Sequence, residues 1–243
     1  MNSRRRSGWR RAGIIMPLIL LVLMIALVPA LGWVRRHPEA NPWARLEVGH
    51  APGWATKRKL AAMVGERQAC TAMLDRAGVR HSALPAIGSG QCLAADRVRL
   101  GRGTGFALSP ASVAPSCAVS AGMLMWMRQI VEPAAQRHFG QRVTLVENLG
   151  SYNCRKIAGR DWISEHASGN AIDVSAFVLA DGRRIVLTRD WDGQAERAAF
   201  LREVRDGACG LFTTVLSPDY NAAHRDHFHL DMAGRVAGWS ICS

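Results

Sequence analysis

Two short stretches of the sequence place metal-binding side chains on segments whose residue pattern predicts strands. In HASGNAIDVSAF, His166 stands seven residues before Asp173, with a Gly-Asn turn between them and an apolar strand beginning around the aspartate. In HFHLDM, His227, His229 and Asp231 alternate with apolar residues. Successive side chains of a strand point to opposite faces, so these polar residues share the faces opposite the core. If the two strands are neighbours, His166, Asp173 and His229 converge.

Two imidazoles and one carboxylate are a suitable ligand set for a catalytic zinc ion, which takes three protein ligands and leaves a fourth position for water. We therefore predict one Zn²⁺ on these three side chains. His227 lies on the same face and is placed to act as the base that handles protons. Asp226 or Asp231 is expected to orient an imidazole. Taken singly, each residue has a plainer reading as a solvated histidine or a turn aspartate. The occurrence of both clusters in one chain favours the metal site.

An uncharged segment, residues 12–34, follows an arginine-rich N-terminus. Its length matches the roughly 20 residues that a helix needs to cross a membrane. Five arginines precede the segment and two follow it, so the positive-inside rule predicts a cytoplasmic tail over residues 1–11. We expect a single-pass anchor in the inner (cytoplasmic) membrane with the remaining chain in the periplasm or wall space. The alternative is a signal peptide cleaved near Ala30-Leu31-Gly32, although the apolar run is long for one.

The formal net charge is +12, and five of the basic residues are the arginines of the N-terminal tail. Because the densest basic cluster is explained by membrane topology, nucleic-acid binding is not expected. Residues 35–55 contain three prolines and little periodicity, which predicts a linker. Residues 56–243 are then one exported domain.

All the cysteines lie in the predicted exported part, and an even number there is typical of a disulfide framework. A thiolate metal site is the alternative, but the sequence contains no C-x-x-C pair. Loop length favours the first two of the following bridges and leaves the third: Cys70–Cys92, Cys209–Cys242 and Cys117–Cys154.

The rest of the pattern predicts an α+β fold in which helices flank an antiparallel sheet. Apolar periodicity and helix stop signals indicate helices over 57–77, 120–139 and 194–207. Strands are expected over 142–149, 171–180, 183–188, 212–216 and 227–232. Asp181-Gly182 is the turn of a hairpin between the second and third of these strands.

Four stretches, in this order, resemble the bacterial extensin-like C-terminal domain family: GSYNCR, SEHASGNAIDVSAF, FLREVRDGACGLF and YNAAHRDHFHLD. The resemblance covers about residues 65 to 243. In addition, SEHASGNAID resembles the S-x-H-x-x-G-x-A-x-D signature of zinc peptidases related to D-Ala-D-Ala carboxypeptidases, and DHFH resembles the H-x-H signature of the allied murein endopeptidases.

These resemblances imply a hedgehog/DD-peptidase type of fold, with zinc on His166, Asp173 and His229 and with His227 as the catalytic histidine. They also assign Arg155 of SYNCR to stabilise an oxyanion or to bind a substrate carboxylate. The alternative for Arg155 is a surface arginine beside a disulfide.

Three further residues of the resembling stretches have less direct roles. We expect Ser164 to cap a turn, and a hydrogen bond within the site is the alternative. Tyr152 is expected to contribute to packing and not to catalysis. His224 stands where carboxypeptidase relatives carry the glutamate of an E-x-x-H motif. The chain therefore follows the H-x-H branch, whose members cut cross-linked murein.

The sequence thus predicts a membrane-anchored zinc peptidase that acts on peptidoglycan stem peptides or cross-links. The alternative is a peptidoglycan-binding or sensing module that keeps the metal pocket but hydrolyses nothing. Replacement of His227 by alanine separates the two, because only the enzyme needs this side chain.

Overall fold

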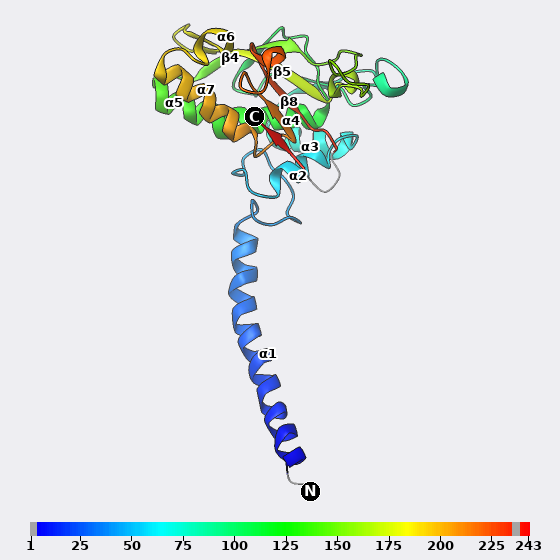
Figure 1. The fold of residues 1–243 in the computed structure, drawn as a ribbon, viewed down its shortest axis with the longest axis vertical. Coiled ribbons are helices and arrows are strands. Elements are labelled where there is room, and N and C mark those ends of the chain that lie inside the picture. Colours follow the sequence, from blue (N-terminus) through cyan, green and yellow to red (C-terminus); the bar gives the residue numbers. More distant parts are fainter. Residues whose placement is uncertain (1–3, 235–238) are drawn as a thin grey trace.

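The computed structural model describes residues 4–234 and 239–243, and shows a body of helices and strands from which one long helix projects (Figure 1). A seven-stranded sheet runs through the body in the order β3-β4-β5-β8-β7-β9, and β6 pairs with β5. Its strands are β3 (Ala107–Ser109), β4 (Val143–Gly150), β5 (Ala171–Leu179), β6 (Arg184–Val186), β7 (Thr214–Leu216), β8 (Phe228–Asp231) and β9 (Ile241–Cys242). A separate two-stranded sheet joins β1 (His81–Ala83) and β2 (Val98–Leu100).

The α+β class is confirmed, but the sheet is mixed rather than antiparallel. Strand β3 runs parallel to β4, and β9 runs parallel to β7, whereas the other neighbours are antiparallel. The two parallel strands lie at the sheet edges and contain only three and two residues. Strands this short show no alternation that a sequence pattern can reveal, so the pattern does not locate either of them.

The helices are α1 (Arg4–Arg36), α2 (Thr56–Ala61), α3 (Arg67–Arg76), α4 (Cys117–Trp126), α5 (Glu132–Phe139), α6 (Leu187–Asp190) and α7 (Ala195–Ala208). The helix predicted over 57–77 is divided into α2 and α3. The chain between them includes Gly65, whose φ of 81° is a left-handed conformation that favours glycine. Apolar periodicity alone did not reveal this interruption.

Helices α4 and α5 form the continuous run that was predicted over 120–139, joined by a π-helical turn (Met127–Val131). The run begins earlier than predicted, at Cys117, because the Ser116 hydroxyl accepts a hydrogen bond from the backbone N–H of Val119. It ends at Gly140, whose φ is 61°.

The core lies between this helical run and one face of the sheet. Trp126 is fully buried, and its indole ring makes edge-on contacts with Phe177 of β5 and Phe228 of β8. Its Nε1–H donates to the Val204 carbonyl of α7 at 2.8 Å. Because the apolar side chains of β5 and β8 face this core, the intervening polar side chains are directed to the other face.

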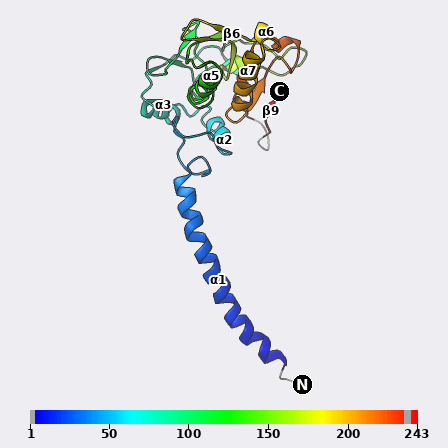
Figure 2. The ribbon, with the colours of Figure 1, turned by 90° about the vertical axis from the view of Figure 1, so that its left-hand side faces the viewer.

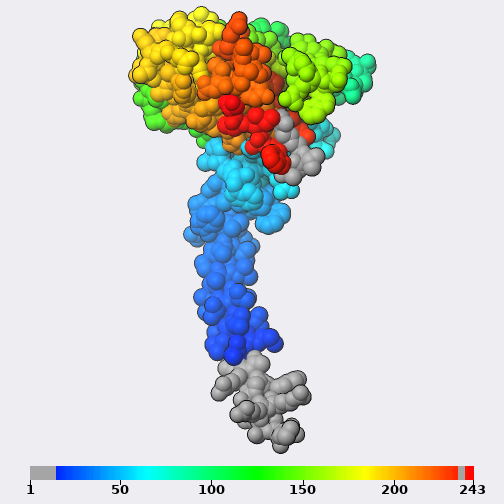
Figure 3. Space-filling view, in the orientation of Figure 1, coloured from blue at the N-terminus to red at the C-terminus, as the bar shows by residue number. Residues whose placement is uncertain are grey.

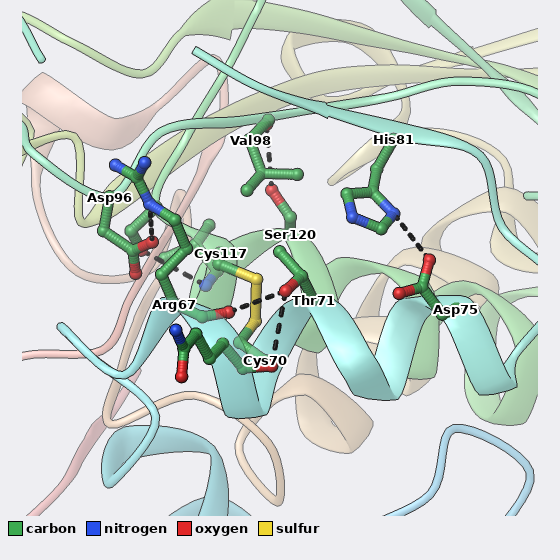
Figure 4. The surroundings of a disulfide bond; sticks show 12 residues. Arg67, Cys70, Thr71, Asp75, His81, Asp96, Val98, Cys117 and Ser120 are labelled. Atoms are coloured by element: carbon green, nitrogen blue, oxygen red, sulfur yellow. Dashed lines mark hydrogen bonds and ion pairs between the residues drawn. A yellow bond between two sulfur atoms is a disulfide. The ribbon is translucent and has the colours of Figure 1, made fainter. Parts of the chain in front are cut away.

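The six cysteines form three disulfides, and two of the three predicted pairings are wrong. Cys209–Cys242 is confirmed, but the other bridges are Cys70–Cys117 and Cys92–Cys154. The preference for short loops failed because packing decides which thiols meet: α3 lies against α4, which brings their cysteines together (Figure 4).

Helix α1 extends away from the body in two perpendicular views (Figures 1 and 2), and its described side chains are free of the body in the space-filling view (Figure 3). Its segment Ile15–Arg36 has 22 residues and a mean hydropathy of 2.7, so it is long and apolar enough to cross a membrane. Whether as signal or anchor, an apolar N-terminal helix followed by a disulfide-bonded body indicates an extracytoplasmic location for that body.

The segment 35–55, predicted as a linker, contributes to the body. Leu46 and Val48 are buried in the hydrophobic core. The proline-rich segment is therefore irregular in structure, as a linker would be, but it packs against the body.

Candidate metal centre

The pairing of β5 with β8 places an aspartate and a histidine directly opposite each other. Asp173 is the register partner of His229 in this antiparallel pair, and Ile172 and Val174 on either side of Asp173 face the core. His166 comes from the short 3₁₀ turn Glu165–Ser168 just before β5. Three side chains that are distant in the sequence therefore meet at the start of β5.

The ligand atoms of His166, Asp173 and His229 lie within 4.8 Å of one another. His166 Nε2 is 3.0 Å from His229 Nδ1 and 3.2 Å from Asp173 Oδ1, and His229 Nδ1 is 3.0 Å from Asp173 Oδ1. Zinc–ligand bonds of about 2.0–2.2 Å in a tetrahedral site separate ligand atoms by about 3.4 Å. Small outward movements of the three side chains would therefore accommodate a metal ion.

The outer nitrogens of both imidazoles are already held by acceptors. His166 Nδ1 donates to the Ser151 carbonyl, and His229 Nε2 donates to Asp231 Oδ2 at 3.0 Å. With those protons in place, the inner nitrogen of each neutral ring presents a lone pair toward the Asp173 carboxylate. Three lone-pair donors that face one another require a cation or an added proton between them, and acceptors behind the imidazoles are typical of metal sites. The donor set therefore fits a metal ion.

The electrostatics of the three side chains favour a positive charge between them. Burial opposes the ionisation of Asp173, but hydrogen bonds from His166 and His229 outweigh it and hold the pKa of this carboxyl well below its usual range. Burial also opposes the charging of His229, but its hydrogen bonds to Asp173 and Asp231 raise the pKa of the imidazole to about 9. In the absence of metal, a proton on His229 occupies the position that a cation would take.

His227 lies beside the three ligands, with its side chain 12% exposed. Its Nε2 is 3.6 Å from Asp173 Oδ1, and its Nδ1 donates to Asp226 Oδ1 at 2.7 Å. The aspartate thus fixes the tautomer in which Nε2 is free to accept a proton beside the site. The sequence suggested Asp226 or Asp231 as the residue that orients an imidazole. Both do so, because Asp226 binds His227 and Asp231 binds His229.

His224 lies beside these residues but is not a ligand in this arrangement. Its ring centroid is 5.2 Å from that of His227, and its Nδ1 is 2.8 Å from Asn221 Oδ1. Burial, followed by the nearby His227, His229 and Arg155 side chains, lowers the pKa of His224 to about 4, and the Asp173 carboxylate only partly offsets this. His224 is therefore neutral at physiological pH.

Arg155 is exposed near this group, since its charge acts on His224. Within the described part of the chain, no residue forms a hydrogen bond with its side chain. It follows directly after the Cys92–Cys154 disulfide, and the Tyr152 hydroxyl donates to the Cys92 carbonyl at 3.1 Å. Tyr152 thus packs against this bridge, while the guanidinium of Arg155 remains available to a ligand.

Ser164 and Ser151 support His166 from its two sides. The Ser164 hydroxyl accepts a hydrogen bond from the His166 backbone N–H at 3.3 Å, which is the capping role expected from the sequence. Ser151 was not singled out, although its carbonyl orients the His166 ring. A backbone carbonyl carries no signal in the residue type, so only the fold could reveal this contact.

A surface hollow of about 470 Å³ is lined mainly by residues 100–108 and by Arg142. Arg142 precedes Val143, which pairs with Leu179 at the opposite end of β5 from Asp173. This hollow is therefore not part of the metal centre, which is defined by its convergent donor atoms.

The sequence matches the family described as Extensin-like protein C-terminus over residues 68–243. No curated protein and no solved structure matches it. The match covers every residue of the metal centre and more than half of the chain. The chain therefore belongs to the extensin-like family through its C-terminal domain.

Proposed function

We propose that this protein is a membrane-anchored, zinc-dependent peptidase that hydrolyses peptide bonds in peptidoglycan stem peptides or cross-links. The observation that carries the proposal is the convergence of two imidazoles and one carboxylate whose inner atoms all present lone pairs to one point. The resemblance of SEHASGNAID and DHFH to the signatures of zinc carboxypeptidases and murein endopeptidases supports the reaction class.

His166 Nε2, Asp173 Oδ1 and His229 Nδ1 would hold the zinc ion. When bound, zinc supplies a Lewis acid that polarises a carbonyl and makes water a nucleophile near neutral pH. The three ligands come from two strands and a turn, with both histidines buried and the Asp173 side chain 13% exposed, which gives the site the rigidity that such chemistry requires.

His227 is the proton-handling residue of this proposal. Its Nε2 faces the site with its lone pair free, and Asp226 stabilises the imidazolium that forms when Nε2 takes up a proton. Arg155 has a planar set of donors that suits a substrate carboxylate or a developing oxyanion. Stem peptides carry such carboxylates, which makes them chemically suitable substrates.

The location of the enzyme follows from α1. We propose that α1 is retained as a single-pass anchor in the cytoplasmic membrane, with the basic tail in the cytoplasm and the disulfide-bonded body in the periplasm. The apolar length of Ile15–Arg36 and the flanking arginines support this topology.

The test uses the full chain purified in detergent or lipid nanodiscs. Zinc content is measured by mass spectrometry, and isolated sacculi are digested and their products identified. We expect about one zinc per chain and released peptide fragments. His166→Ala should lose both zinc and cleavage, whereas His227→Ala should keep zinc and lose cleavage.

His81→Ala is the matched control, because the side chain of His81 on β1 is as shielded as that of His227, with 12% exposure for both. It should leave zinc and cleavage unchanged. A protein that holds zinc, binds sacculi and cleaves no murein would instead be a binding or sensing module. A protein that takes up no zinc would exclude the metal centre itself.

A further inference from the structure

Two tryptophans are left in solvent by the segment that follows α1. Trp43 is 88% exposed and Trp54 is 69% exposed. Both belong to residues 37–59, which we call the collar and which joins the end of α1 to the body (Figure 1). A large aromatic side chain that is exposed to water contributes no free energy of burial, but it does so when a partner covers it.

The collar is held firmly against the body. Leu46 and Val48 are buried in the core, and Gln129 Nε2 donates to the Val48 carbonyl at 3.1 Å. Lys57 Nζ donates to the Cys209 carbonyl of the body at 3.0 Å. The two tryptophans are therefore presented by a fixed part of the chain.

The collar is also basic. Its residues 37–59 contain four arginines and lysines and two glutamates. Both glutamates are paired, Glu39 with His37 at 2.7 Å and Glu47 with Arg76 at 2.8 Å. Arg45 and Arg58 are exposed, and no hydrogen bond to either side chain is found among the described residues. The unpaired charge of this surface is positive, which suits anionic lipid headgroups.

The length of α1 sets where the collar must lie if α1 spans a membrane. The 22 residues of Ile15–Arg36 extend for about 33 Å as a helix, close to the ~30 Å of a hydrocarbon core. Arg36 then reaches the edge of the hydrocarbon, and the chain beyond it enters a headgroup layer about 5–8 Å thick. Tryptophan is enriched in this layer because its ring is both apolar and able to donate a hydrogen bond.

We propose that the collar rests in the headgroup layer of the membrane that α1 spans, with Trp43 and Trp54 inserted and with Arg45 and Arg58 against anionic headgroups. The proposal depends on α1 being retained as an anchor but not on zinc or catalysis. It fixes the orientation of the metal centre relative to the membrane, so that the enzyme reaches peptide strands close to the bilayer and does not sweep the wall on a flexible tether.

The test reconstitutes the full chain into vesicles of phosphatidylcholine and phosphatidylglycerol whose acyl chains carry bromine, a quencher of tryptophan fluorescence. Trp43→Phe and Trp54→Phe remove one emitter each while keeping an aromatic ring. Trp162→Phe is the matched control, since Trp162 is 68% exposed on a loop of the body remote in sequence from the collar. Circular dichroism verifies that each variant is folded.

Subtracting the spectrum of each variant from that of the wild type gives the fluorescence of the replaced tryptophan. The fluorescence of Trp43 and of Trp54 should be quenched by brominated lipid and protected from aqueous iodide. The fluorescence of Trp162 should be quenched by aqueous iodide and not by brominated lipid. In addition, Arg45→Ser with Arg58→Ser should weaken the lipid quenching more in vesicles that contain phosphatidylglycerol than in pure phosphatidylcholine. The proposal is overturned if Trp43 and Trp54 behave like Trp162. Because the readout involves no hydrolysis, that result would leave the peptidase proposal standing.

Discussion

Zinc binding should compete with a proton on His229, and the structure sets the size of that competition. Hydrogen bonds to Asp173 and Asp231 outweigh burial and raise the pKa of His229 to about 9 in the metal-free protein. Its Nδ1 is the atom that would bind zinc, so the ion must displace this proton. At pH 7 the group is two pH units below its pKa, which weakens the apparent zinc affinity about 100-fold, or by roughly 2.7 kcal/mol.

Two consequences can be measured on the full chain after removal of metal. Titration calorimetry at pH 7, repeated in buffers of different ionisation enthalpy, should show about one proton released per zinc bound. The zinc affinity, measured against a competing chelator, should rise about tenfold per pH unit from pH 6.5 to 8.5. The control is His81→Ala, which should bind zinc as the wild type does. Binding without proton release, with a flat affinity over this range, would refute the reasoning.

Three other predictions concern the metal centre and the disulfide framework. Asp231→Asn should weaken zinc binding about 10- to 100-fold in chelator competition. Asp231 Oδ1 accepts from the Ala233 N–H, so the new amide NH₂ would face His229 Nε2 and move the ring proton onto the ligand nitrogen. The metal-free protein should lose stability as the pH rises from 6.5 through 9, because the raised pKa of His229 stabilises the fold only while its imidazole is protonated. Urea unfolding at pH 6 and at pH 9.5 tests this, and equal midpoints would contradict it. Peptide mapping without reduction should recover Cys70 linked to Cys117, and double replacement by alanine should lower the free energy of unfolding by about 2–4 kcal/mol. A Cys70–Cys92 peptide in that map would contradict the fold around α3.

The faces of the site strands were predictable from the sequence, but their pairing was not. The alternation of apolar and polar residues in AIDVSAF and HFHLDM predicts that Asp173 and His229 point away from the core. The structure confirms this. Their direct opposition depends on β5 lying next to β8 in the sheet, although β6 and β7 intervene in the sequence. That neighbour relation is set by the packing of the whole domain around residues such as Trp126.

The remaining differences have a common physical origin. Cys70 pairs with Cys117 because α3 packs on α4, and no feature of either cysteine's local sequence encodes that contact. Ser151 orients His166 through a backbone carbonyl, which every residue type possesses. Local pattern thus predicts which side chains are polar and which way they point, whereas long-range packing decides which of them meet.

The central claim is that His166 Nε2, Asp173 Oδ1 and His229 Nδ1 bind one zinc ion. A crystal structure of the zinc-loaded protein, with anomalous data collected on both sides of the zinc absorption edge, tests it most directly. We predict one strong anomalous peak at about 2.0–2.2 Å from each of these three atoms. An anomalous peak elsewhere, for example between His224 and His227, or a fully loaded protein with these three side chains still in mutual contact and no peak between them, would contradict the claim.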